Sequence, residues 1–143
     1  MRSYLDASVL VPTLVMEPAS AAVDRFLKAL DRGPIVSDFA ASEVASGMSR
    51  LVRMGQIQAV EAARRLSEFD AWCAAEAEET SIQSADIRLS ALFVRRFELM
   101  LRTPDAVHIA ACRRLGVPLV SLDRRLASSA RQLGVESELI VAT

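Results

Sequence analysis

The chain has 143 residues, of which 52% are hydrophobic and 24% are charged, and its 17 basic and 18 acidic side chains give a net charge of −1. These proportions are close to the average for globular domains and exclude a disordered or fibrous chain. The chain has no net positive charge that would attract polyanions, so the binding of a nucleic acid would require a local group of basic residues.

Short apolar runs alternate with longer helical patterns along the whole chain. Ser37 is a good N-cap, and the apolar residues after it follow one helical face as far as Gly55. The pair Thr103-Pro104 opens another helix, with proline in its favoured first turn. In chain order, the pattern predicts a strand over 2–5, helices over 8–15 and 20–30, a strand over 34–36, helices over 37–55 and 57–77, a weak strand over 80–83, helices over 84–101 and 103–115, a strand over 118–122, a helix over 123–133 and a strand over 138–141.

This alternation predicts an α/β sandwich with a mostly parallel sheet, and the length suits one domain over residues 1–143. The two cysteines, Cys73 and Cys112, lie far apart inside apolar helical stretches, which predicts buried thiols in a reducing compartment. No apolar run approaches the roughly 18 residues of a membrane span. We therefore expect a cytoplasmic protein without a membrane segment.

Four acidic residues from distant parts of the chain are expected at one edge of this sheet. Asp6 and Asp123 each follow a strand, and Asp105 lies in the first turn of a helix that begins at the same edge. Glu43 lies about 9 Å along its helix at a rise of 1.5 Å per residue, beside the apolar face. Ligands bind at this carboxyl edge of parallel strands. Unpaired carboxylates gathered there repel one another, and a divalent cation would relieve the repulsion.

Position alone does not single out these four acids. Asp38 and Asp86 also lie in the first turns of predicted helices and would reach the same edge. Taken one at a time, Asp6, Asp105 and Asp123 equally suit capping or first-turn positions, where an acid stabilises a helix by about 0.3–1 kcal/mol. The sequence pattern leaves the choice among six acids open.

Four segments around these acids resemble the PIN-domain ribonucleases, specifically the VapC-type toxins of bacterial toxin-antitoxin pairs. The segments are YLDASVL (4–10), SEV (42–44), TPDAVHIA (103–110) and LVSLDRRL (119–126). The resemblance extends from about residue 2 to residue 141 and selects Asp6, Glu43, Asp105 and Asp123. Position 121 is Ser where the family often has Thr, which preserves the hydroxyl group.

The resemblance implies a three-layer sandwich around a five-stranded, mostly parallel sheet and an acidic pocket that holds Mg²⁺ or Mn²⁺. In this interpretation Asp6 and Asp105 bind the metal directly, while Glu43 and Asp123 complete the shell or orient waters. Water activated by the metal then attacks a phosphodiester of RNA, leaving 5′-phosphate and 3′-hydroxyl ends. The resemblance also implies a homodimer and a cognate antitoxin, whose Arg or Lys an acidic groove would attract.

Several neighbouring side chains have two interpretations. Ser8 and Ser121 suit either the positioning of a water or phosphate oxygen, or a helix cap and a strand end. His108 is expected to be buried in an apolar helix, although its spacing from Asp105 also suits a pair with that carboxylate or a metal contact. Four aromatic residues are expected in the core or at a dimer surface rather than as base-stacking platforms: Phe69, Trp72, Phe93 and Phe97.

Two other functions stay open beside the metal-dependent ribonuclease. One is a non-catalytic PIN-like module that binds protein or RNA, and the other is a metal-dependent DNA nuclease. A receiver domain is disfavoured because the only lysine is Lys28, and a haloacid-dehalogenase phosphatase because Ala7-Ser8 follows Asp6 in place of an Asp-x-Asp motif. Four arginine doublets are expected on solvated helix faces, although Arg also suits phosphate contacts: 64–65, 95–96, 113–114 and 124–125.

Overall fold

The computed structural model describes residues 2–142, and five short parallel strands in this range form one sheet in the order β3-β2-β1-β4-β5. Tyr4 lies at the centre of the sheet, paired with Ile35 on one side and Leu119 on the other. The predicted five-stranded parallel sheet is confirmed. The strands are β1 (Tyr4–Leu5), β2 (Ile35–Ser37), β3 (Glu78–Thr80), β4 (Leu119–Ser121) and β5 (Ser137–Leu139).

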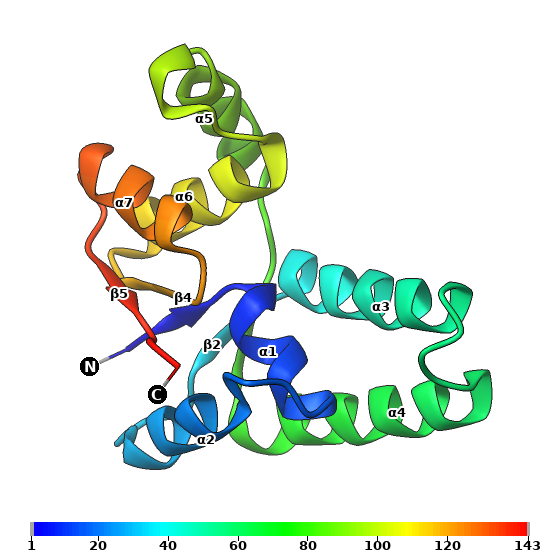
Figure 1. Cartoon of the computed structure of the whole chain (residues 1–143). Helices are drawn as coiled ribbons and strands as arrows, with labels where there is room; N and C mark the ends of the chain where they lie inside the picture. Colours follow the sequence, from blue (N-terminus) through cyan, green and yellow to red (C-terminus); the bar gives the residue numbers. More distant parts are fainter. Residues whose placement is uncertain (1, 143) are drawn as a thin grey trace.

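Helices cover both faces of this sheet and complete the predicted three-layer sandwich. Helices α5, α6 and α7 lie on one face and α1 to α4 on the other, with α3 and α4 extending away from the sheet as a long hairpin (Figure 1). None of the helices within residues 2–142 is long and apolar enough to cross a membrane. Their bounds are α1 (Ala7–Leu14), α2 (Ser20–Ala29), α3 (Asp38–Arg53), α4 (Ala59–Glu76), α5 (Ser84–Val94), the 3₁₀ helix η1 (Phe97–Leu99), α6 (Thr103–Leu115) and α7 (Arg124–Gln132).

The three central strands place successive side chains in two separate hydrophobic cores, because side chains alternate along a strand. The core under α5, α6 and α7 contains Tyr4, Ile35 and Leu119. The core under α1 to α4 contains the residues that follow them, Leu5, Val36 and Val120. Burial on both faces explains why these strands are continuous apolar runs. Cys73 and Cys112 are buried free thiols, as predicted.

Two helix ends follow the capping signals in the sequence. The Ser37 hydroxyl accepts a hydrogen bond from the Ala40 N–H at 3.0 Å, which confirms the N-cap of α3. At the C-terminal end of α6, Gly116 adopts a φ of 67°, a left-handed conformation that glycine tolerates best. These two ends fix where α3 starts and where the chain turns back towards β4.

Two predicted boundaries in the middle of the chain are wrong. The helix predicted over 84–101 ends at Val94, and η1 follows it, so that Leu99 packs inside while Phe97 is 81% exposed. The weak strand predicted over 80–83 lies at Glu78–Thr80, and α5 begins at Ser84 as predicted, with Gln83 as its N-cap. Strand β3 is an exposed edge strand, so it has no apolar alternation that could have located it.

Candidate active site

Asp6 lies at the carboxyl end of β1, and its carboxylate is held by two serine hydroxyls. Its side chain is buried, and Ser8 donates to Oδ1 at 2.6 Å while Ser121 donates to Oδ2 at 2.7 Å. Burial raises the pKa of Asp6 above its ordinary value, and the two serine hydrogen bonds oppose that rise. The structure therefore assigns both serines a definite contact, since they orient this carboxylate.

Asp105 lies in the first turn of α6 and is half-buried. Burial raises the pKa of Asp105, and the negative charges of Asp123, Asp6 and Glu43 raise it further. Each of these three carboxylates therefore lies close enough to Asp105 for its charge to act on it. The four acids selected in the sequence thus gather at one edge of the sheet.

Asp123 serves as the N-cap of α7 directly after β4. Its Oδ1 accepts hydrogen bonds from the N–H groups of Arg125 at 2.9 Å and Leu126 at 3.2 Å. The Asp123 N–H in turn donates to the Ser121 hydroxyl at 2.9 Å. The capping role that the sequence allowed is therefore real, and it leaves Oδ2 of this exposed side chain available for other contacts.

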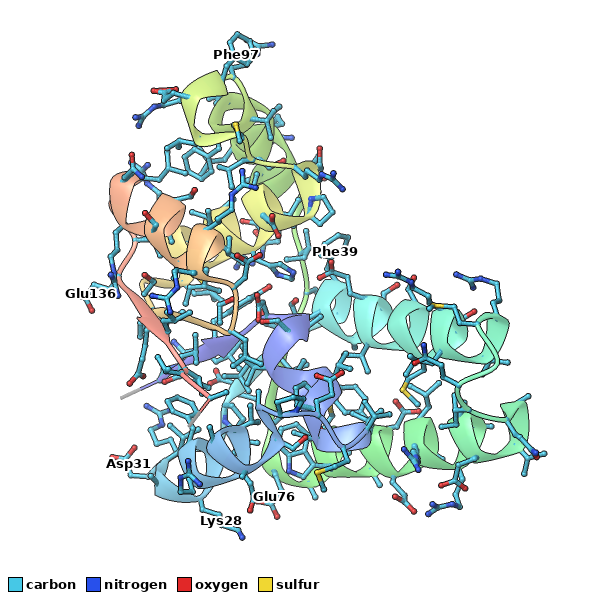
Figure 2. All side chains as sticks on the ribbon, in the orientation of Figure 1. Lys28, Asp31, Phe39, Glu76, Phe97 and Glu136 are labelled. Atoms are coloured by element: carbon cyan, nitrogen blue, oxygen red, sulfur yellow. The ribbon has the colours of Figure 1, made fainter. Side chains whose placement is uncertain are left out.

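The side chain of Glu43 is held by a buried histidine of α6, His108. His108 is 2% exposed, and its Nε2 lies 2.5 Å from Oε1 of Glu43, whose side chain is 31% exposed. On the other side of the ring, Nδ1 lies 2.6 Å from the Tyr4 hydroxyl, which also contacts the Ser37 hydroxyl at 2.8 Å. Phe39, in the first turn of α3 (Figure 2), packs against the imidazole with ring centroids 5.4 Å apart.

For a neutral imidazole, the donors and acceptors around His108 have one arrangement that uses each proton once. A carboxylate at Glu43 only accepts, so Nε2 donates and Nδ1 accepts. The Tyr4 hydroxyl must then donate to Nδ1 and accept from Ser37, whose oxygen also accepts from the Ala40 N–H. The hydrogen bonds run in one direction from the start of α3, through the core, to the Glu43 carboxylate.

The two other first-turn acids have structural roles away from this group. Asp86 is 2% exposed, accepts hydrogen bonds from the Arg114 guanidinium and closes a capping box with Gln83. Asp38 accepts from the backbone N–H groups of Phe39 and Ile82, both through Oδ1. Both acids follow strands on the β2-β3 side of the sheet, away from β4.

The donor chemistry of the four acids fits a hard divalent cation, although their side chains are not already arranged as a ligand cage. Across residues 2–142, no group of three or more His, Cys, Asp or Glu side chains converges closely enough to hold a metal. Three of the carboxylates are engaged by Ser, His or backbone donors, whereas Asp105 makes no hydrogen bond with another described residue. Mg²⁺ commonly binds one or two carboxylates and keeps several waters, so it does not require such a cage.

Comparison with known proteins places this geometry in a family. The sequence matches the family model of the PIN domain over residues 3–132. The chain belongs to the PIN-domain family. A curated relative of this PIN domain, Ribonuclease VapC46 of Mycobacterium tuberculosis, is 34% identical over 136 residues and covers 92% of each chain.

Solved structures with low sequence identity share the PIN fold seen here. VapC20 of Mycobacterium tuberculosis, described as a sarcin-ricin loop cleaving toxin, superposes with a TM-score of 0.71 at 13% identity, covering 89% of this chain and 94% of its own. DNA-bound VapBC from Salmonella typhimurium gives a TM-score of 0.71 at 14% identity, covering 99% of each chain. FitAcB from Neisseria gonorrhoeae gives 0.66 at 12% identity, covering 94% and 95%.

Sequence reasoning missed the hydrogen-bond chain behind the acids of this PIN domain. His108 is buried as predicted, but it contacts Glu43 from α3 rather than Asp105 on its own helix. Tyr4 was not singled out, although a tyrosine inside a short buried strand needs a partner for its hydroxyl. That requirement, together with the single histidine of the chain, is the signal that could have linked them.

Proposed function

We propose that this PIN domain is a metal-dependent endoribonuclease and the toxin of a toxin-antitoxin pair. The observation that carries the proposal is the placement of Asp6, Glu43 and Asp123 close enough to Asp105 for their charges to act on it. A relative that is 34% identical over 92% of this chain is named a ribonuclease, which supports RNA as the substrate. The same fold in a toxin that cleaves the sarcin-ricin loop adds to this support.

The proposed cofactor is Mg²⁺ or Mn²⁺, held by Asp6 and Asp105, with Glu43 and Asp123 completing the shell or orienting waters. Their oxygen atoms are the ligands that these hard cations prefer. When bound, such a cation supplies positive charge that offsets the carboxylates, attracts a phosphodiester and favours deprotonation of water. The mutual repulsion of the four acids is the physical reason for expecting a cation there.

The side chains of the site divide the remaining work between them. Ser8 and Ser121 hold both oxygens of Asp6, which fixes the direction in which this carboxylate faces. Glu43 uses Oε1 for His108, so its Oε2, which has no hydrogen-bond partner among the described residues, is free to accept a proton from water. In our proposal Glu43 therefore orients the attacking water, and the Asp123 cap holds the edge of the site rigid.

The proposed protein partner is a cognate antitoxin that covers the acidic edge. Structures with this fold include toxin-antitoxin complexes from Klebsiella pneumoniae and VapBC-1 from Haemophilus influenzae. An Arg or Lys of an inhibitor would be attracted to four clustered carboxylates and would compete with the metal. The buried free thiols Cys73 and Cys112 suit a reducing compartment, which supports our placing both partners in the cytoplasm.

The proposed assembly is a homodimer, supported by exposed apolar side chains in the last turn of α5 and in η1. Leu92 is 57% exposed and Phe97, which projects from the tip of this layer in Figure 2, is 81% exposed. Large apolar side chains exposed together often mark a protein interface. We expect Phe97→Asp to shift the purified protein from dimer to monomer in analytical ultracentrifugation at tens of micromolar. A wild-type protein that is monomeric under these conditions would refute the dimer.

The test of the proposed function combines metal binding with substrate choice. We would titrate Mn²⁺ or Mg²⁺ into wild type and Asp6→Asn by calorimetry, and then incubate structured RNA and DNA of matched sequence with each protein. We expect wild type to bind the metal and cleave only RNA, to lose cleavage in chelator, and Asp6→Asn to lose both properties. Arg50→Gln, on the exposed outer end of α3, is the matched surface control.

Each alternative function gives a different result in this experiment. Cleavage of DNA in preference to RNA would replace the proposal with a DNA nuclease. A wild-type protein that binds no metal at millimolar concentration and cleaves neither substrate would instead be a binding module. Equal RNA cleavage by wild type and Asp6→Asn would refute the assignment of the site.

A further inference from the structure

The charges of this chain are divided unequally between its two helical layers. Residues 84–132, which contain α5, η1, α6, β4 and α7, carry nine arginines and four acidic residues, a net charge of +5. The rest of the chain carries eight basic and fourteen acidic residues, a net charge of −6. The overall charge of −1 therefore hides a basic layer over one face of the sheet (Figure 1).

Most arginines of this basic layer have no partner within the protein. Arg114 is committed to Asp86, and Arg131 donates to the Ser137 carbonyl. By contrast, Arg64 on α4 is bound by acids of its own helix. Six exposed guanidinium groups of the layer make no side-chain hydrogen bond or ion pair with any residue in 2–142, namely those of Arg88, Arg95, Arg102, Arg113, Arg124 and Arg125.

Two of these free arginines line a groove beside the acidic edge. The groove lies between η1 and α7 and has a volume of about 340 Å³. It is lined by Met100, Arg124, Arg125, Ser128 and Gln132 among others, and by Glu98, whose carboxylate is paired with Arg96. Arg124 and Arg125 follow directly on Asp123, whose charge acts on Asp105. The η1-α7 groove therefore presents free cations, a hydroxyl and an amide next to the proposed cleavage site.

We propose that the η1-α7 groove binds the phosphate backbone of the RNA on one side of the bond that is cut. The inference rests on the proposed ribonuclease function and adds where the substrate lies. RNA must approach four carboxylates that repel its phosphates, and flanking arginines offset that repulsion. Guanidinium groups pair with phosphate oxygens in a bidentate manner, and the Ser128 hydroxyl supplies a further donor.

The test measures how RNA binding depends on salt when the arginines of the groove are changed. The double variant Arg124→Gln/Arg125→Gln is compared with Arg50→Gln/Arg53→Gln, a matched pair of exposed arginines in the last turn of α3. Binding of a labelled single-stranded RNA is followed by fluorescence anisotropy in EDTA, so that no cleavage occurs, between about 50 and 300 mM KCl. Circular dichroism checks that both variants keep the thermal midpoint of wild type.

Loss of two phosphate contacts should change both affinity and its salt dependence. We expect the groove variant to bind about tenfold more weakly near 0.1 M salt, with the slope of log Kd against log [KCl] reduced by roughly 1.4, and the control to bind as wild type. Arg124→Lys/Arg125→Lys should keep the salt slope, because the charge remains. In Mg²⁺, the groove variant should raise KM for RNA cleavage while changing kcat little.

The outcomes separate this inference from the proposed function. If wild type cleaves RNA and the groove variant binds and cleaves like wild type, the groove is refuted while the ribonuclease stands. If wild type does not cleave RNA but its RNA binding depends on Arg124 and Arg125, the ribonuclease function is refuted, while the role of the groove in RNA binding is retained. Equal losses in the α3 control, or tighter binding of polyglutamate than of RNA, would also overturn the assignment.

Discussion

Replacing two buried aspartates should have opposite effects on stability and activity. Asp86 forms a buried ion pair with Arg114 and caps α5, while Asp6 faces the acidic site. Removing one partner of a buried pair costs roughly 3–5 kcal/mol. Because the Arg114 side chain is 25% exposed and can regain water, and because Asn still accepts hydrogen bonds, we expect Asp86→Asn to cost about 2 kcal/mol. For a chain of this size that lowers Tm by about 7 °C.

Asp6→Asn should leave stability unchanged or increase it. Burial raises the pKa of Asp6, which means that folding disfavours the charged form of this carboxyl group. Asn removes that charge, and the hydroxyl groups of Ser8 and Ser121 can each donate to or accept from an amide. Metal binding and RNA cleavage should be lost, because the amide supplies neither the charge nor the second acceptor oxygen. A residue that is needed for activity but lowers the stability of the folded protein is the expected trade-off.

The assay pairs thermal unfolding in EDTA with RNA cleavage in Mg²⁺ for the two variants and wild type. We expect Asp86→Asn to unfold at lower temperature but, when folded, to cleave at nearly the wild-type rate. Asp6→Asn should unfold at or above the wild-type temperature and be inactive. The reverse pattern, an inactive but stable Asp86→Asn beside an unstable, active Asp6→Asn, would refute the division of the six acids into functional and structural groups.

Three further predictions concern the buried hydrogen-bond chain and the site charges. His108→Ala should lower RNA cleavage about tenfold or more by releasing Glu43, and His108→Gln should recover part of the loss in single-turnover kinetics. Tyr4→Phe should lower the free energy of unfolding by about 1–3 kcal/mol in urea titration, because His108 Nδ1 loses its donor; an unchanged value would contradict the assigned direction of the chain. In EDTA, the raised pKa of Asp105 means that the folded state binds its proton more tightly, so the stability contributed by this group falls as pH rises from about 4 through the raised pKa. The Tm of Asp105→Asn should therefore fall less than the Tm of wild type as the pH rises from about 4 to 7. Parallel curves of Tm against pH would show that the charge of Asp105 does not destabilise the folded protein.

The separation of Asp6 and Asp123 from Asp86 depended on the order of the strands. Five of the six acids follow strands or begin helices, and Glu43 lies further along the helix that Asp38 begins, so local position does not separate the two groups. In the folded sheet β1 and β4 are neighbours at the centre, which brings Asp6 and Asp123 together, whereas β3 lies at the edge and carries Asp86 away. Strand order results from packing among distant segments, so local periodicity does not contain it. The family resemblance supplied the selection that position did not.

Local signals determined most of the elements and their ends. The alternation of apolar runs and helical patterns predicted the parallel sheet, and Ser37 and Gly116 marked helix ends through their capping chemistry. The end of α5 at Val94 was not predicted, because the sequence continues in a helical pattern beyond it. The chain turns there so that Leu99 is buried. Propensity acts over a few residues, and tertiary packing overrides it.

The sequence by itself determined the fold class, and its family resemblance selected the four acids of the candidate site from six that position alone left open. Only the tertiary structure decided which groups touch. Asp105 and His108 are three residues apart on α6, yet the imidazole turns to Glu43, 65 residues away in the chain. The reason is that His108 lies on the buried face of α6, where it contacts Tyr4 of β1 and Glu43 of α3, whereas Asp105 lies in the half-buried first turn of the same helix.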